Sequence, residues 1–421
     1  MKTPLNSQWE IPKNWEIVSL NDITSDWRGG APLEPEDFTT QGFAVLHKGG
    51  IQRGGKIVID AKKKTFTTEK YAQRYQKSVI DKTYMAATLR DLVPSGPSIG
   101  LIADLAKSPS EKYILAQGAY GFKIDLNRVK PSYLVWLSNY EPFREYIKRY
   151  CVGSTQIHIR TPVFQELKIP LPPLSYQWKI AEVLDRAQSL ISKRREAIAE
   201  LDTLTQAIFL EMFGDPAFNP QKWRRVQLVD LCNSANDIKC GPFGTQLGKD
   251  EYTTEGVPLW GIKNVNALFK IPTREFLEAR TAKRLMQYSI EPGDIVMTRK
   301  GTVGNCAVYP DSYPLGIMHS DLLRLRVSLQ KCNSMFLSHQ LHYSRDVELQ
   351  LALISGGAIM PGINVTKLKS VEVLVPPVSL QSEFAHRVEA VEKLKAAHRA
   401  SLSELHALFA SLQHRAFRGE L

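Results

Sequence analysis

The sequence repeats itself, and this internal repeat limits the fold more than any other feature of the chain. Residues 172–213 align without a gap with residues 376–417, at an offset of 204, and 11 of the 42 positions are identical. Both stretches begin with the pattern Pro-Pro-x-Ser-x-Gln, at Pro172 and at Pro376. Self-similarity at a fixed period indicates that a chain folds as copies of one unit. We therefore expect the 421 residues to form two copies of about 205 residues each.

The match continues upstream of these stretches, but only in patches. The pattern Pro-x-x-Trp-x-x-Val-x-Leu-x-Asp begins at Pro12 and again at Pro220. Asp91-Leu92-Val93 aligns with Asp294-Ile295-Val296, although the Arg-Lys pair that follows the second segment is missing after the first. Each copy is thus a variable globular part followed by a more similar stretch. We expect the loops that follow these two segments to differ between the copies.

The similar stretches have the periodicity of long helices. Residues 176–213 contain neither Gly nor Pro, and their apolar residues recur at helical spacing. Ser175 is a candidate N-cap and Gly214-Asp215-Pro216 is a stop signal. A helix of about 37 residues spans roughly 55 Å and usually pairs along a narrow seam. We expect an α+β fold in which two globular domains are joined by two such helices, paired as an antiparallel coiled coil.

Charge is concentrated in the globular parts. The chain carries 54 basic and 43 acidic residues, a net charge of +11. Residues 1–171 have a net charge of +7 and residues 217–375 of +5, whereas residues 172–216 and 376–421 have −2 and +1. Two basic domains on a nearly neutral helical pair suit a polyanion bound at two places, such as double-stranded DNA. They do not suit a membrane-surface helix, whose charge would lie on the helix itself.

Other sequence features argue against secretion, membrane insertion and several kinds of catalytic site. Five scattered cysteines and a polar N-terminal segment predict a reduced cytoplasmic protein, and no apolar run approaches the ~18 residues of a membrane helix. The stretch Gly241–Asp250 lacks the spacing of a phosphate-binding loop. His339-x-x-His342 has no nearby third ligand for zinc, and no Asn/Asp-Pro-Pro-aromatic tetrapeptide of an amino-methyltransferase is present. We expect no metal site, no bound cofactor and no catalysis in this chain.

Several loops combine glycine with residues that bind phosphates and base edges. Glycine lets the backbone approach DNA closely, Lys and Arg neutralise phosphates, and Arg, Asn and Gln pair with bases in the major groove. Such loops recur in both copies, which is a stronger signal than any one of them. The candidate DNA-binding residues are Lys48, Arg53, Lys56, Lys63, Gln156, His158 and Arg160 in the first copy and Lys263, Asn264, Thr298, Arg299, Lys300, Thr302 and Asn364 in the second.

The repeated motifs resemble those of type I restriction-modification specificity subunits. The resemblance rests on Ile169–Gln177 and Val373–Gln381, on the Pro-x-x-Trp openings, and on the segments Pro258–Asn264 and Gly293–Gly304. It implies two target recognition domains, each reading one half of an asymmetric, split DNA sequence, and a pair of helices that sets the spacing. It also implies two methyltransferase subunits that use S-adenosylmethionine, and a restriction subunit that uses ATP and Mg²⁺.

From these observations we expect target recognition domains at residues 1–171 and 217–375 and conserved helices at residues 172–216 and 376–421. Two alternatives remain open at this point. One is a bipartite DNA-binding scaffold that has no restriction partners. The other is a two-domain enzyme whose catalytic site lies in a cleft.

Overall fold

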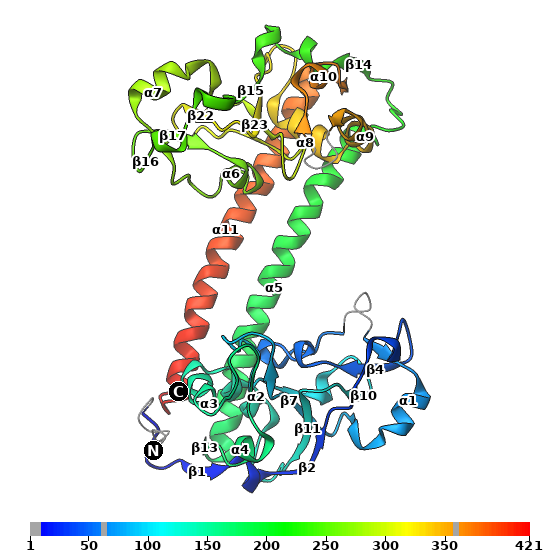
Figure 1. Ribbon diagram of the computed structural model, residues 1–421, viewed down its shortest axis with the longest axis vertical. Coiled ribbons are helices and arrows are strands. Elements are labelled where there is room, and N and C mark those ends of the chain that lie inside the picture. The colour runs from blue at the N-terminus through cyan, green and yellow to red at the C-terminus, as the bar shows by residue number, and fades with distance from the viewer. Residues whose placement is uncertain (1–9, 60–64, 357–361) are drawn as a thin grey trace. The chain divides into compact units, whose positions relative to one another are not determined.

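The computed structural model divides the chain into two compact units that share two long helices (Figure 1). It describes residues 10–59, 65–356 and 362–421. Residues 1–195 and 400–421 form unit 1, and residues 196–399 form unit 2. Helix α5 (Leu174–Phe213) begins in unit 1 and ends in unit 2, whereas α11 (Val378–Ala416) runs from unit 2 into unit 1.

Each unit contains half of an antiparallel helix pair. In unit 1, the Tyr176 hydroxyl near the start of α5 hydrogen-bonds with the backbone of Leu421, and Arg195 Nη2 lies 3.1 Å from His406 Nε2. In unit 2, Lys395 of α11 forms an ion pair with Asp202 of α5 at 3.1 Å. In both units, rising residue numbers on α5 face falling numbers on α11. The expected antiparallel pairing is confirmed, although α5 begins at Leu174, so Ser175 lies inside the helix and the N-cap prediction is wrong.

The globular part of unit 1 is built on two small sheets. A four-stranded antiparallel sheet has the order β2-β11-β7-β9, and a five-stranded sheet, in which β4 and β10 are parallel, has the order β3-β5-β4-β10-β6. The strands are β2 (Thr24–Gly29), β3 (Phe38–Thr39), β4 (Phe43–Leu46), β5 (Phe66–Thr67), β6 (Val79–Asp81), β7 (Met85–Thr88), β9 (Ile102–Asp104), β10 (Lys112–Leu115) and β11 (Ala119–Ile124).

Unit 2 repeats this plan strand for strand. Its four-stranded sheet has the order β15-β23-β20-β21, and its five-stranded sheet has the order β16-β18-β17-β22-β19 with β17 and β22 parallel. The strands are β15 (Ile238–Cys240), β16 (Tyr252–Thr253), β17 (Val257–Trp260), β18 (Phe276–Leu277), β19 (Ser289–Ile290), β20 (Ile295–Thr298), β21 (Cys306–Val308), β22 (Gly316–Met318) and β23 (Leu322–Leu325).

Two short helices and a two-stranded ribbon connect each sheet pair to the long helices. The helices are α2 (Pro131–Asn139) and α3 (Glu141–Lys148) in unit 1 and α8 (Ser334–Tyr343) and α9 (Arg345–Ile354) in unit 2. The ribbons pair β1 (Glu16–Ser19) with β13 (Lys168–Leu171), and β14 (Arg224–Gln227) with β26 (Glu372–Val375). β13 leads directly into α5 and β26 into α11. The repeated Pro-Pro-x-Ser-x-Gln pattern is therefore a strand-to-helix junction in both copies.

The apolar residues of each unit form cores of their own. In unit 1 one core joins the four-stranded sheet to α2 and α3 and includes Phe122, Tyr133 and Phe143, all with at most 1% of their surface exposed. In unit 2 the equivalent core includes Phe336 and Leu323 and receives Phe209 from α5 and Phe384 from α11. Each globular part thus packs on the end of the helix pair that lies in its own unit.

Candidate nucleic-acid interface

Strand ends from both sheets of unit 1 meet around Gly118. The N–H of Ala116 donates to the carbonyl of Leu46 at the end of β4, at 3.0 Å. The N–H of Leu89, just after β7, donates to the carbonyl of Gly118 at 3.0 Å, and the Thr88 hydroxyl donates to the carbonyl of Lys48 at 3.0 Å. The loops after β4 and β7 and before β11 are therefore held together at one edge of the fold.

Lys48 and Arg90 form a cationic cluster at this edge, and His158 lies opposite Arg90. A Cβ placed on Gly118 would lie 3.1 Å from Cβ of Arg90 and 3.4 Å from Cδ of Lys48, so these two side chains flank the glycine. Arg90 also lies opposite His158, where β8 (Arg90–Asp91) pairs with β12 (Ile157–His158). Burial, and then the charge of Arg90, lower the pKa of Lys48. Crowded cations of this kind favour an anionic ligand such as a phosphate.

The charge of Asp91 works in the opposite direction and raises the pKa of Lys48, while its carboxylate is hydrogen-bonded to the neighbouring loop. It accepts hydrogen bonds from the N–H of Ser98 at 2.8 Å and from the Ser98 hydroxyl at 2.6 Å. Burial works to raise the pKa of Asp91, but these hydrogen bonds and others from backbone N–H groups outweigh it and lower the pKa. Asp91 therefore shapes the segment that follows β8.

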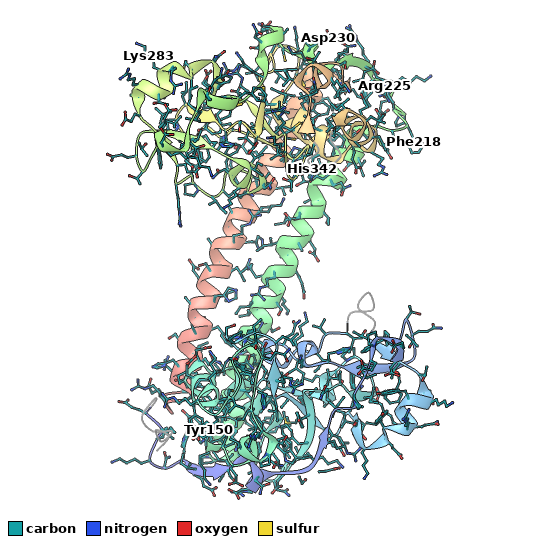
Figure 2. The ribbon with its side chains drawn as sticks, viewed as in Figure 1. Tyr150, Phe218, Arg225, Asp230, Lys283 and His342 are labelled. Carbon is teal, nitrogen blue, oxygen red and sulfur yellow. The ribbon has the colours of Figure 1, made fainter. Side chains whose placement is uncertain are left out.

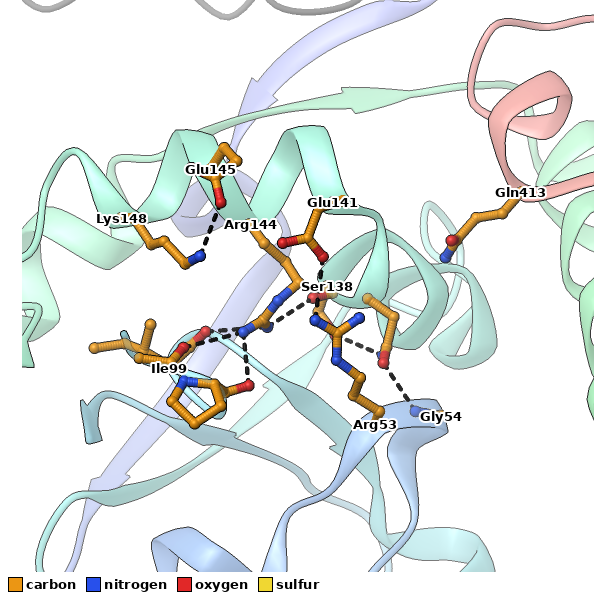
Figure 3. A network of polar contacts seen from close by, with 12 residues as sticks. Arg53, Gly54, Ile99, Ser138, Glu141, Arg144, Glu145, Lys148 and Gln413 are labelled. Atoms are coloured by element: carbon orange, nitrogen blue, oxygen red, sulfur yellow. Dashed lines mark hydrogen bonds and ion pairs between the residues drawn. The ribbon is translucent and has the colours of Figure 1, made fainter. Parts of the chain in front are cut away.

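Arg53 and Lys56 lie on a separate hairpin that packs on α2 (Figure 3). The N–H of Gly54 donates to Oδ1 of Asn139 at 2.9 Å, and Arg53 forms an exposed ion pair with Glu141 at 3.1 Å. The contacts of Arg53 therefore bring it to the α2–α3 junction rather than to Lys48. Lys56 is exposed.

The other candidate DNA-binding residues of the first copy are exposed or lie outside the described residues. Gln156 lies in an exposed turn after Gly153, and Arg160 is exposed just before α4 (Thr161–Gln165). Lys63 lies outside the described residues.

The same edge in unit 2 gathers Arg299, Lys300 and Asp321. The N–H of Arg299, just after β20, donates to the carbonyl of Asp321 at 2.8 Å. Arg299 Nε donates to the carbonyl of Ile363 at 3.0 Å, and its guanidinium lies 4.7 Å from the ring centre of Phe243. Lys300 forms an ion pair with Asp321 at 3.4 Å. Here the positive residues are fixed in place by a carbonyl, a ring and a carboxylate.

Four other second-copy predictions use their polar groups to shape these loops. Thr298 is fully buried and its hydroxyl donates to the carbonyls of Thr302 and Asn305. Asn264, inside α6 (Ile262–Asn266), accepts from the N–H of the N-cap residue Gly261 at 3.1 Å, whereas Asn364 is the N-cap of α10 (Val365–Lys369) and accepts from N–H groups in its first turn. The hydroxyl of Thr302 donates to Oδ1 of Asn266 at 3.0 Å. Lys263 is an exposed residue of α6.

The structure corrects the alignment between the two copies. Because β7 and β20 occupy the same place in their four-stranded sheets, Met85–Thr88 corresponds to Ile295–Thr298. The sequence alignment of Asp91 with Asp294 is therefore wrong, and Arg90 takes the place of Lys300. Sequence reasoning missed Arg90, although a Thr followed two residues later by a basic residue, Thr88-x-Arg90 and Thr298-x-Lys300, is a signal that would have found it.

The other sequence candidates have ordinary structural surroundings. Nδ1 of His339 donates to the carbonyl of Met335 at 2.8 Å, while His342 on the same helix is exposed (Figure 2). All five cysteines are free; Cys232, Cys306 and Cys332 are buried, whereas Cys151 and Cys240 are half-buried. In residues 10–59, 65–356 and 362–421, no three His, Cys, Asp or Glu side chains are grouped to hold a metal ion, and no helix is long and apolar enough to cross a membrane.

Comparison with known proteins matches both copies to one family. Residues 12–201 and 220–407 each match the type I restriction modification DNA specificity domain. The type I restriction enzyme MjaIX specificity subunit of Methanocaldococcus jannaschii is 20% identical over 416 residues, covering 90% of this chain and 87% of that protein. The EcoKI specificity subunit of Escherichia coli K12 is 24% identical over 301 residues, covering 66% and 63%. The crystal structure of the S subunit from M. genitalium has the same fold, with a TM-score of 0.57 and 16% identity over 97% of this chain and 98% of that one.

Proposed function

The chain belongs to the family of type I restriction-modification DNA specificity proteins, and from this premise we propose how its two domains divide the recognition of DNA. The protein is the sequence-specificity subunit of a type I restriction-modification system, and its duplicated domain suits a bipartite DNA target. We assign one half-site to a target recognition domain at residues 1–171 and the other to one at residues 217–375. Residues 172–216 and 376–421 are the conserved helices between them.

The observation that carries this assignment is the recurrence of a cationic cluster at the same strand ends in both units. Lys48 and Arg90 flank Gly118 in unit 1, and Arg299 and Lys300 lie beside Asp321 in unit 2. Lys and Arg at loop ends bind phosphates and guanine edges, which position and specify a protein on DNA. We propose that both edges face the duplex, with Gln156, His158 and Arg160 beside the first cluster and Lys263 and Asn364 beside the second.

The family description implies catalytic partners, and we propose the following division of labour. Two methyltransferase subunits supply S-adenosylmethionine chemistry on adenine, and a restriction subunit supplies ATP- and Mg²⁺-dependent cleavage. This chain itself is non-catalytic and acts in the cytoplasm. The sequence supports that role, because it contains neither a phosphate-binding loop nor the tetrapeptide of an amino-methyltransferase.

Mapping of methylated adenines tests this function. The chain is co-expressed with its methyltransferase subunit in a host that lacks type I systems, and N6-methyladenine is mapped across the genome. We expect one asymmetric motif in two parts separated by an unread spacer of fixed length. Methylation without a split motif, or failure of the two proteins to co-purify, contradicts the proposal and favours a scaffold without restriction partners.

The length of the spacer provides a second test, since α5 and α11 each contribute to both units. Deleting seven residues from each helix removes about 10 Å of rise and preserves the heptad phase. We expect the preferred spacer to shorten by roughly three base pairs, at 3.4 Å per base pair. An unchanged spacer contradicts the proposed role of the helices in spacing the half-sites.

A further inference from the structure

A carboxylate lies inside the cationic cluster of unit 2. Oδ1 of Asp321 is 3.4 Å from Nζ of Lys300, and Oδ2 is 3.2 Å from Nδ1 of His319. The side chain retains 26% exposure, so Lys300 holds it while part of it still faces solvent. Arg299 joins the same group through its N–H, which donates to the Asp321 carbonyl at 2.8 Å.

The fold does not require an acid at this position. Gly118 occupies the equivalent place in unit 1, because its carbonyl accepts from the N–H of Leu89 as that of Asp321 accepts from Arg299. The hydrogen bond that joins the strand ends therefore forms from backbone groups in both units. The Asp321 side chain is an addition that distinguishes the second cluster from the first.

A carboxylate in a DNA-binding surface restricts which groups of the DNA can lie next to it. A carboxylate placed close to a phosphate is repelled by it, and the repulsion grows where water is excluded from between the two charges. In the major groove, by contrast, it accepts a hydrogen bond from the exocyclic amino group of cytosine or adenine. It also repels the acceptor edges of guanine and thymine, so one group both selects and rejects bases.

We propose that Asp321 is a specificity-determining residue that accepts a hydrogen bond from the amino group of one base, with cytosine as the first choice, in the second half-site. Lys300 positions its carboxylate. This inference rests on the proposed function, because it assumes that the strand ends of unit 2 face DNA. It names the chemical class of one base that the second domain reads.

Competition binding with the full methyltransferase complex tests the inference. Once methylation mapping has given the target, each position of the second half-site is varied in short duplexes, and relative affinities are measured for the wild type and Asp321→Asn. We expect the wild type to prefer cytosine or adenine at one position and Asp321→Asn to lose about tenfold of that preference, the discrimination of one good base contact. Preferences at all other positions stay unchanged.

Two control variants separate base reading from a structural role. Lys300→Met removes the ion pair but keeps the carboxylate, so we expect weaker binding to all duplexes, with the same preferred base and a smaller preference for it. Asp311→Asn removes an exposed acid elsewhere in unit 2 and is expected to change nothing. Should Asp321→Asn not yield folded complex, Asp321→Glu is used, and we expect it to keep the preferred base with reduced discrimination.

Three results overturn the inference. They are an unchanged preference at every position in Asp321→Asn, an equal loss at every position, and a preference for guanine or thymine, which have no amino group on the major-groove edge, at the affected position. In these cases the wild-type complex still binds its split target, so the proposed function stands. A wild-type complex that shows no sequence preference at all contradicts both the inference about Asp321 and the proposed function.

Discussion

At the scale of single residues, Gln177 and Gln381 explain why both copies carry the same motif. Both side chains are fully buried. Oε1 of Gln177 accepts from the N–H of Lys130 at 2.8 Å, and Oε1 of Gln381 accepts from the N–H of Asn333 at 2.8 Å. Each Nε2 donates to the carbonyl of the first proline of its motif, Pro172 or Pro376. One amide thus joins the strand end, the long helix and the start of α2 or α8.

Replacing Gln177 by leucine is expected to destabilise the protein by about 1–3 kcal/mol, because the N–H of Lys130 and the carbonyl of Pro172 lose their partner inside the protein. The measurement is the free energy of unfolding in urea. Gln206→Leu on the exposed face of the same helix is the matched control and is expected to change stability by less than about 0.5 kcal/mol. Equal effects of the two substitutions would show that the buried amide has no special role.

His339 makes the stability of the chain depend on pH. Burial is the main cause that lowers its pKa, and the ring packs edge-on against Phe384 with centroids 5.2 Å apart. In the unfolded chain a histidine titrates near 6.5, so between that value and the lower folded pKa the unfolded state binds more protons. Stability from this group is present above about pH 6.5 and is lost as the pH falls below it.

His339→Phe is therefore expected to reduce the loss of melting temperature between pH 7.5 and pH 5.5. A depressed pKa weakens stability by at most about 1.4 kcal/mol per pH unit, which sets the size of the effect. The comparison variant is His342→Asn, three residues along the same helix at an exposed position; the charge of His342 is a smaller cause of the lowered pKa of His339 than burial, so we expect the variant to change the pH dependence much less than His339→Phe. If both variants and the wild type lose the same number of degrees, burial of His339 does not contribute to the pH dependence.

At the scale of elements, a glycine allows the two sheets of each unit to approach. A Cβ on Gly30 would lie 2.0 Å from the carbonyl oxygen of Ala116, and a Cβ on Gly241 would lie 2.1 Å from that of His319. Both glycines follow the first strand of the four-stranded sheet, and both carbonyls belong to the segment that links the sheets. Gly241, which superficially suggests a phosphate-binding loop, thus has a packing role in the structure.

Gly30→Ala and Gly241→Ala are each expected to destabilise the protein by at least about 1–3 kcal/mol, since a backbone carbonyl cannot move away without disturbing both sheets. Gly49→Ala is the control, because a Cβ there has no neighbour within 4 Å. Differential scanning calorimetry measures the change in melting. A normal melting profile for Gly241→Ala would contradict this close approach of backbones.

The sequence predicts an element better when the apolar pattern of that element is longer. The long helices were predicted to within two residues at their start, because periodicity over some 40 residues outweighs local ambiguity. Strands such as β3 and β5 are two residues long, too short to show alternation. The correspondence of Arg90 with Lys300 depends on strand order, which the sequence does not record. Thr298 and Asn364 resemble base-reading residues in sequence, yet their polar groups hold backbone in place.

Hydrogen-bond networks between side chains and distant segments also could not be predicted from the sequence. Arg144 of α3 is buried, with 1% of its surface exposed, and donates to four backbone carbonyls, including those of Gly96 and Pro97 (Figure 3). Burial lowers its pKa. Nothing in the local sequence Glu141–Lys148 distinguishes this arginine from an exposed one, since three of its four partners lie more than 40 residues away.

At the scale of the whole molecule, the two units have separate cores and separate cationic edges. Residues 1–171 carry a net charge of +7 and residues 217–375 of +5, and no core cluster contains residues of both globular parts within the described chain. Each cationic edge therefore belongs to a globular part that has a core of its own. Recognition of the two half-sites should be separable.

This separability predicts the effect of one substitution in each unit. Arg90→Gln is expected to alter base preference only in the first half of the split motif, and Arg299→Gln only in the second half, as read from the methylated sequences made by each complex. A residue that contacts phosphate instead lowers affinity evenly and reduces the slope of log affinity against log salt by about one. Salt titration of each variant distinguishes the two roles. If either substitution changed preferences in both halves, the two target recognition domains would not read DNA independently, and the assignment of one half-site to each unit would fail.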